Sequence, residues 1–185
     1  MKTAILTVAG LAAAASAQSF VADLSGVGVD GAAPVVIGVN NANSGALTTI
    51  DFDITVTTTS PSWGSEVNIT LTHLPSGFSF NADGDDADFD DDGPADLLFG
   101  WGNSVGTFSF SGSVDLSGQL ADVNGAWEVT LSDDFDDLFA NPDHVYEAGS
   151  TITINNIPAP AGLAVLGLGG LAAARTAFSR ASRKR

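Results

Sequence analysis

A run of aspartates in the middle of the chain carries the clearest chemical signal in the sequence. Eight Asp lie between positions 83 and 96, and the segment 88–93 fits the pattern D-x-D-x-D-G. Calcium takes six to eight oxygen ligands at about 2.3–2.6 Å, and alternate residues of a tight loop can point at one centre. The pattern therefore predicts a structural Ca²⁺ site. Its expected ligands are Asp83, Asp85, Asp88, Asp90, Asp92 and Asp96.

The aspartate run differs from an EF-hand, because Phe99 stands at the twelfth place instead of Glu and no helical pattern flanks the segment. A bidentate ligand would have to come from Asp83, from Asp85 or from a second acidic run at 133–137. A solvated acidic loop without metal is the alternative interpretation of either run. Repulsion between eight clustered carboxylates favours a bound cation for the first run.

Catalytic motifs are weak. Residues 102–106 read G-N-S-V-G, but a strand pattern rather than a helix follows Ser104, so the context of a nucleophile elbow is missing. His73 and His144 are the two histidines, and His73, at the end of a strand pattern, is expected at the surface or in a turn. With 22 carboxylates present, a glycosidase-like pair carries no information. No enzyme is predicted, and a secreted hydrolase stays as the alternative from another functional class.

Tryptophans offer a second kind of chemistry, because their faces can stack on sugars. Trp127 alternates with apolar residues and is expected in the core. Trp63 and Trp101 lie next to turn-rich segments and are candidates for glycan stacking. An extracellular polysaccharide-binding module is therefore an alternative function.

Charge is distributed very unevenly along the chain. All six Lys and Arg lie in the two ends, and residues 18–174 contain 19 Asp, 3 Glu and no cationic side chain except the two histidines. Such a segment cannot displace counterions from a nucleic-acid backbone, so DNA or RNA binding is excluded. It also attracts multivalent cations. The chain has no Cys, which excludes disulfides and thiolate metal sites.

Alternation of apolar and polar residues indicates what positions these groups. Period-two patterns place alternate side chains on opposite faces of a strand. About eight such strands, separated by Gly, Asn, Pro and Asp, predict an all-β fold, a two-sheet antiparallel β-sandwich or jelly roll. The expected strands span 50–57, 67–74, 107–116, 127–131 and 150–155, with less regular ones at 20–24, 34–39 and 97–101.

The first residues have the composition of a secretory signal peptide. Lys2 precedes an apolar run and the A-x-A sequence that ends at Ala17. Signal peptidase is expected to cut between Ala17 and Gln18, which leaves a mature chain that begins at Gln18. The N-terminal signal helix then occupies residues 1–17.

The last 29 residues combine a Pro motif, an apolar run and a basic end. The apolar run 161–174 would reach about 21 Å as a helix, short of the roughly 30 Å of a hydrocarbon core. Pro158-Ala159-Pro160, the Gly/Ala/Leu-rich helix and the Arg/Lys cluster resemble the PEP-CTERM sorting signal of bacterial surface proteins. The resemblance implies cleavage near the Pro motif by an exosortase-type membrane protease. A plain C-terminal membrane anchor is the alternative, and both place the preceding domain outside the cell.

The central domain is also similar, more loosely, to the P-domain-like jelly rolls of secreted proteins. The likeness rests on segments 62–77, 125–133 and 149–154, and on Trp63, Gly125 and Trp127 within them. Together these features predict a signal peptide at 1–17, a β-sandwich at 18–156 and a sorting segment at 157–185. The expected function is a structural or adhesive role at the cell surface or in the extracellular matrix, with Ca²⁺ as a stabilising ion.

Overall fold

A computed structural model describes residues 17–31, 33–84, 96–133 and 142–158, and the residues from Ala17 to Pro158 form one compact unit. The predicted signal helix and C-terminal apolar helix lie outside the described residues. No helix among the described residues has the length and apolar character needed to cross a membrane. The described chain forms strands β1 (Gln18–Asp23), β2 (Gly28–Val29), β3 (Val35–Asn41), β4 (Gly45–Thr58), β5 (Val67–His73), β6 (Phe78–Asp83), β7 (Leu97–Leu98), β8 (Thr107–Asp115), β9 (Gly125–Asp133), β10 (His144–Tyr146) and β11 (Thr151–Pro158), with the 3-10 turn η1 (Gly64–Glu66) before β5.

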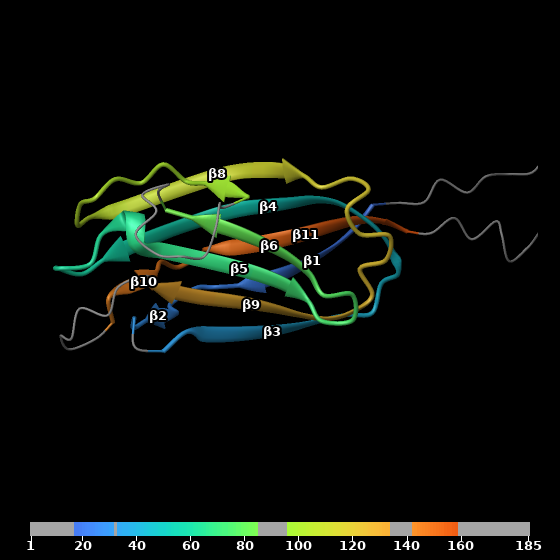
Figure 1. Cartoon of the computed structure of the whole chain (residues 1–185), viewed down its shortest axis with the longest axis horizontal. Coiled ribbons are helices and arrows are strands. Elements are labelled where there is room, and N and C mark those ends of the chain that lie inside the picture. The colour runs from blue at the N-terminus through green and yellow to red at the C-terminus, as the bar shows by residue number, and fades with distance from the viewer. Residues whose placement is uncertain (1–16, 32, 85–95, 134–141, 159–185) are drawn as a thin grey trace, which may run out of the picture. The chain divides into compact units, whose positions relative to one another are not determined.

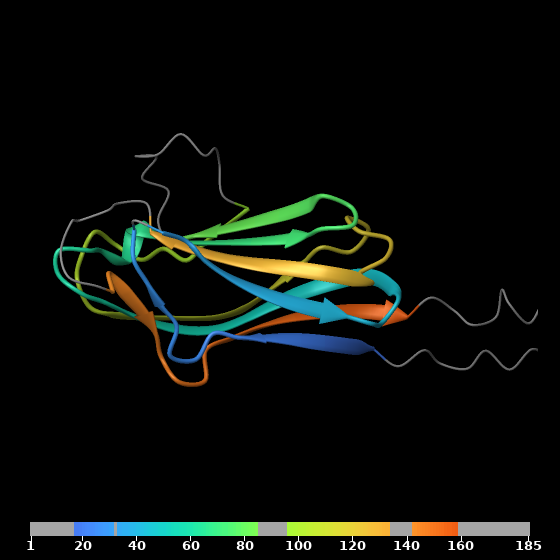
Figure 2. The same cartoon turned by 90° about the horizontal axis from the view of Figure 1, so that it is seen from below.

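The strands form two sheets, which confirms the all-β prediction. In the β4 sheet the order is β1-β11-β4-β10-β2, and β8 pairs with the other edge of β4. In the β9 sheet the order is β3-β9-β5-β6-β7. Figure 1 shows the strands of both sheets, and Figure 2 shows the two layers from the side. The long strand β4 is central because it pairs with β11 and β10 end to end along one side and with β8 along the other.

Alternation explains why the two sheets pack against each other. On β4 the apolar residues Ile50, Phe52, Ile54 and Val56 are at most 1% exposed, while the polar residues between them face outward. The matching inward residues of the β9 sheet meet them in a single core. Trp127 is fully buried in it, as expected. Burial of apolar area on these inner faces is the main favourable contribution to folding.

The structure differs from the sequence-based expectation in three places. Strands β2, β6 and β10 were not expected, and β6 includes residues 81–83 of the supposed acidic loop. The short strand β7 pairs with β6 in parallel, so the sheets are not purely antiparallel. Strand β11 runs to Pro158, two residues past the expected end of the domain at 156.

Gly45 begins β4 at a point where no side chain fits. Its φ is +149°, and an added Cβ would collide with the carbonyl of Ile157 on β11. We expect Gly45→Ala to lower the free energy of unfolding by about 1–3 kcal/mol or more, because the residue must adopt a conformation restricted to glycine and also push β11 away. Urea unfolding of the full chain measures this change.

Gly38→Ala is the matched control. Gly38 lies on the exposed face of β3, and an added Cβ meets nothing within 4 Å. The control should change stability by less than about 0.5 kcal/mol. Equal unfolding midpoints for the two variants would show that the contact between Gly45 and β11 is not tight.

Candidate functional site

The first acidic run begins at the end of β6. Asp83 is the last residue of that strand and pairs with Asn68 of β5. The next residue, Gly84, donates its N–H to the Val67 carbonyl at 2.9 Å and accepts from the Trp101 N–H at 2.7 Å. Of the expected calcium ligands, Asp85, Asp88, Asp90 and Asp92 lie outside the described residues. Asp83 and Asp96 are described and mark the two ends of the segment.

Asp96 returns the chain to β6. Its N–H donates to the Asn81 carbonyl at 2.9 Å, and its carboxylate Oδ2 accepts from the Asn81 N–H at 2.9 Å. The segment that carries the D-x-D-x-D-G pattern therefore follows β6 directly and ends at a residue that is hydrogen-bonded to β6. This closure brings Asp96 near the root of the run, as the calcium hypothesis requires of a shared site.

The second acidic run begins at Asp133, the last residue of β9, and residues 134–141 lie outside the described residues. Asp133 pairs with Val67 of β5, and its neighbour Ser132 pairs with Asn68. Asn68 thus stands between Asp83 on one side and Ser132 on the other, so the two runs leave the β9 sheet from the same end. The roots of the two runs, Asp83 at the end of β6 and Asp133 at the end of β9, are two strand spacings apart, about 10 Å.

No group of three or more His, Asp or Glu side chains among the described residues is close enough to hold a metal ion. Four of the expected calcium ligands lie in the segment 85–95, outside the described residues. The two nearby roots make a site shared between the runs geometrically feasible.

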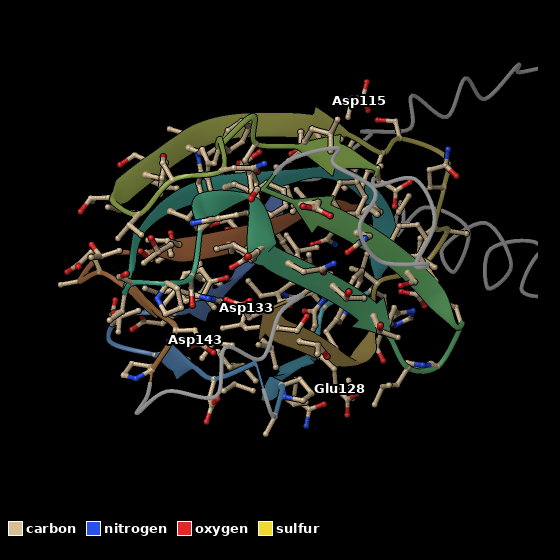
Figure 3. All side chains as sticks on the ribbon, turned by 60° about the vertical axis from the view of Figure 1, so that its left-hand side comes forward. Asp115, Glu128, Asp133 and Asp143 are labelled. Atoms are coloured by element: carbon tan, nitrogen blue, oxygen red, sulfur yellow. The ribbon has the colours of Figure 1, made fainter. Side chains whose placement is uncertain are left out.

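Asp133, the first residue of the second run (labelled in Figure 3), belongs to a group of buried polar side chains. His144 Nδ1 is 3.0 Å from Asp133 Oδ2, and both side chains are completely buried. Because a carboxylate only accepts, Nδ1 carries the hydrogen. His144 belongs to the β4 sheet and Asp133 to the β9 sheet, so this hydrogen bond joins the two sheets where the chain crosses between them.

Tyr146 adds a third polar group to this interior. Burial raises the pKa of its phenol far above the usual range, and the negative charge of Asp133 raises it further. Neither the Tyr146 hydroxyl nor His144 Nε2 has a hydrogen-bond partner in the described part of the chain. Asp143, next to His144, accepts the N–H of Gly31 at 2.6 Å and ties the end of the β9–β10 connection to the segment after β2.

The two candidate stacking residues differ in exposure. Trp63 is 41% exposed beside η1, which is compatible with a ligand contact. Trp101 is 5% exposed and packs against Phe99 at 4.6 Å and Phe108 at 5.7 Å between ring centroids. Trp101 therefore presents no open face to a sugar and is not a stacking site in this structure, because its indole fills the core beneath β7 and β8.

His73 and Ser104, which were considered for hydrolase chemistry, take part in structural hydrogen bonds. His73 is 2% exposed, so it does not lie at the surface, but it belongs to the turn after β5, which was the other expected position. Its Nε2 donates to the Asn124 carbonyl at 3.0 Å, so its Nδ1 accepts from the Ser76 hydroxyl at 2.7 Å. Ser76 Oγ also accepts the Phe78 N–H at 3.1 Å, which closes the β5–β6 turn. Ser104 is exposed in the loop before β8, and its carbonyl accepts from the Gly64 N–H.

The predicted processing points lie at the first and last strands. Ala17 precedes β1, and Gln18 is its first residue. Pro158 is the last residue of β11 and pairs with Gly45, whereas Ala159 and Pro160 lie outside the described residues. Strands β1 and β11 are antiparallel neighbours, with Gln18 opposite Asn156, so both predicted cleavage points lie at the same end of the β4 sheet.

Comparison with known proteins gives little further information. No protein-family model matches the chain, and no curated protein sequence matches it. A chain in the crystal structure of the Aeromonas sobria serine protease (ASP) and chaperone (ORF2) complex is similar in shape, at 11% identity and a TM-score of 0.35. The match covers 78% of this chain and 27% of that one. A likeness of this degree carries no conclusion about function.

Proposed function

We propose that this chain is an exported, surface-sorted β-sandwich of the jelly-roll type with a structural or adhesive role in the cell envelope or extracellular matrix. In this proposal Ca²⁺ stabilises the domain at the acidic end of the β9 sheet. Signal peptidase removes the N-terminal segment, and an exosortase-type protease acts on the C-terminal one. The role is not catalytic.

One observation carries the proposal: the two acidic runs are rooted about 10 Å apart, on either side of β5, at one end of one sheet. The carboxylates that follow these roots repel each other, and residues 18–174 contain no Lys or Arg to compensate them. A divalent cation with hard oxygen ligands relieves that repulsion. The cation would then link the β6–β7 and β9–β10 connections, whose preceding strands both pair with β5.

Three further features support the rest of the proposal. The chain passes repeatedly from one sheet to the other, as in a jelly roll. Strand β1 begins at the expected signal cleavage point and β11 ends at the Pro motif, so cleavage at both points leaves every described strand in the domain. His73 uses both ring nitrogens in a turn and His144 is fully buried, which supports a role without general-base chemistry.

Calcium is expected to raise the melting temperature of the full chain, because a ligand that binds only the native state stabilises it by mass action. At a concentration of 100 times the dissociation constant the gain is about 2.7 kcal/mol. Scanning calorimetry in EDTA and in millimolar Ca²⁺ measures this difference. Identical melting curves under the two conditions would reject calcium stabilisation.

The double variant Asp90→Asn with Asp92→Asn is expected to lose most of the calcium response. A matched control, Asp115→Asn with Glu128→Gln, removes two charges from strands β8 and β9 away from the acidic runs. The control should keep the full response, and Figure 3 labels both of its positions. An equal loss in the two variants would indicate a general charge effect instead of a site.

A further inference from the structure

A groove of about 530 Å³ lies on the outer face of the β4 sheet, away from the acidic runs. Three neighbouring strands form it, β8, β4 and β11, which lie side by side in Figure 1. The polar side chains that line it are carboxylates and hydroxyls, and the one aromatic residue of the lining, Phe52, is buried. The polar lining residues are Thr49, Asp51, Asp53, Ser111, Ser113, Thr151 and Thr153.

Strand register arranges these side chains in two parallel rows. Asp51 stands between Ser113 and Thr153, and each of these is its direct neighbour across a strand pair. Asp53 stands in the same way between Ser111 and Thr151. Each row is therefore a carboxylate flanked by two hydroxyls. The side chains of a row are about 4.8 Å apart, and the rows follow each other at about 6.8 Å along the strands.

The Asp51 carboxylate is held in a fixed orientation by hydrogen bonds. Asp51 Oδ1 accepts the Ser113 hydroxyl at 2.5 Å, and its Oδ2 accepts from the Asn155 amide at 2.7 Å. The same Asn155 amide also donates to the Thr49 hydroxyl at 3.0 Å. Each carboxylate oxygen keeps acceptor capacity beyond these bonds. Such a preorganised acceptor costs little conformational entropy when a ligand binds.

The hydrogen-bonding groups of the two rows indicate which kind of ligand fits the groove. Carboxylates require donors, and hydroxyls both donate and accept, so a chain of adjacent neutral hydroxyl groups complements both. An anionic ligand is repelled, because no Lys or Arg occurs between residues 18 and 174. A calcium ion needs six to eight oxygens around one centre, whereas Asp51 and Asp53 stand in separate rows about 6.8 Å apart.

We infer that this groove binds a neutral polysaccharide, with Asp51 and Asp53 accepting sugar hydroxyls and the flanking Ser and Thr side chains completing the contacts. The inference names the partner of the adhesive role and rests on that part of the proposed function. It does not depend on calcium or on the sorting tail. It also differs from stacking on tryptophan, because the groove contains neither Trp63 nor Trp101.

The test is affinity electrophoresis and titration calorimetry of the full chain with a neutral glucan, a mannan and a galactan, and with an acidic polyuronate as comparison. At least one neutral polymer should bind and the polyuronate should not. The variants Asp53→Ala and Asp51→Ala should each weaken binding at least tenfold. The control Glu128→Ala removes the same charge from the outer face of the β9 sheet and should bind like the unmodified chain.

Several outcomes would overturn the inference. One is the absence of binding to all three neutral polymers by a chain that melts cooperatively. Another is unchanged binding in Asp53→Ala, a variant at an exposed position that should fold even if Asp51→Ala does not. Binding abolished by EDTA, or a calcium response that disappears in Asp51→Ala, would identify a cation site instead.

The same experiments separate the groove from the calcium site. If calcium does not raise the melting temperature but the groove still binds a neutral polymer, calcium stabilisation is rejected and the groove inference stands.

Discussion

Replacing His144 with leucine is expected to lower the free energy of unfolding by about 3–5 kcal/mol. The His144 imidazole is the partner of the Asp133 carboxylate at 3.0 Å, and both groups are fully buried. Without the imidazole a carboxylate remains in the interior with its compensation reduced, and such a group is costly. Urea unfolding followed by tryptophan fluorescence measures the loss.

A double-mutant cycle separates this effect from simple loss of packing. The variants are His144→Leu, Asp133→Leu and the combination of both. The double variant buries no charge at this position. Its loss in free energy of unfolding should therefore be smaller than the sum of the two single losses, and no larger than the loss in His144→Leu alone. Strict additivity would mean that the pair does not join the two sheets energetically.

Trp127→Ala is expected to destabilise the fold by about 3–5 kcal/mol. The indole is fully buried, with ring centroids 4.9 Å from His73 and 5.8 Å from Phe20, and its Nε1–H donates to the Val123 carbonyl at 3.1 Å. Truncation removes these contacts and leaves a cavity between β9 and the turn after β5. Circular dichroism during urea unfolding is the appropriate measurement, because the substitution changes fluorescence directly.

Trp63→Ala serves as the control for the size of the residue removed. Trp63 is 41% exposed, so the same truncation should cost less than about 1 kcal/mol. If the two tryptophan variants unfold at the same urea concentration, the buried Trp127 indole contributes no more to stability than the exposed Trp63 indole, and the prediction is wrong.

Period-two alternation made most of the fold predictable. It located β4, β5, β8, β9 and β11, because long strands with one buried face repeat the pattern several times. Strands β2 and β10 span only two and three residues, too short for a pattern to emerge. Strand β6 was missed because its last residues, Asn-Ala-Asp, look like the beginning of the acidic loop.

The burial of two polar residues, Asp133 and His73, could have been predicted by extending the same alternation to the ends of their strands. On β9 the inward series Trp127, Val129, Leu131 continues to Asp133, and on β5 the series that begins at Val67 continues to His73. Both polar residues therefore fall on the core face, where a partner is required. The partners were not predictable, because His144 and Asn124 come from other strands and loops.

The candidate groove was predictable only in part. Alternation places Asp51 and Asp53 on the outer face of β4 and the serines on the outer face of β8. Which residues become neighbours depends on the register of three strands far apart in sequence, and a shift by one residue would turn the rows to the inside. The calcium hypothesis remains a prediction, since most of its ligands fall outside the described residues.

The position of β11 between β1 and β4 has a mechanical consequence. The strand that leads to the C-terminal segment is hydrogen-bonded along both flanks, to β1 from Thr151 to Asn156 and to β4 from Thr151 to Pro158. Tension applied between Pro158 and the opposite end of the sheet acts along this strand, so the bonds of both ladders bear the load together in shear instead of opening one after another. A domain tethered by its last strand in this way is suited to resist pulling.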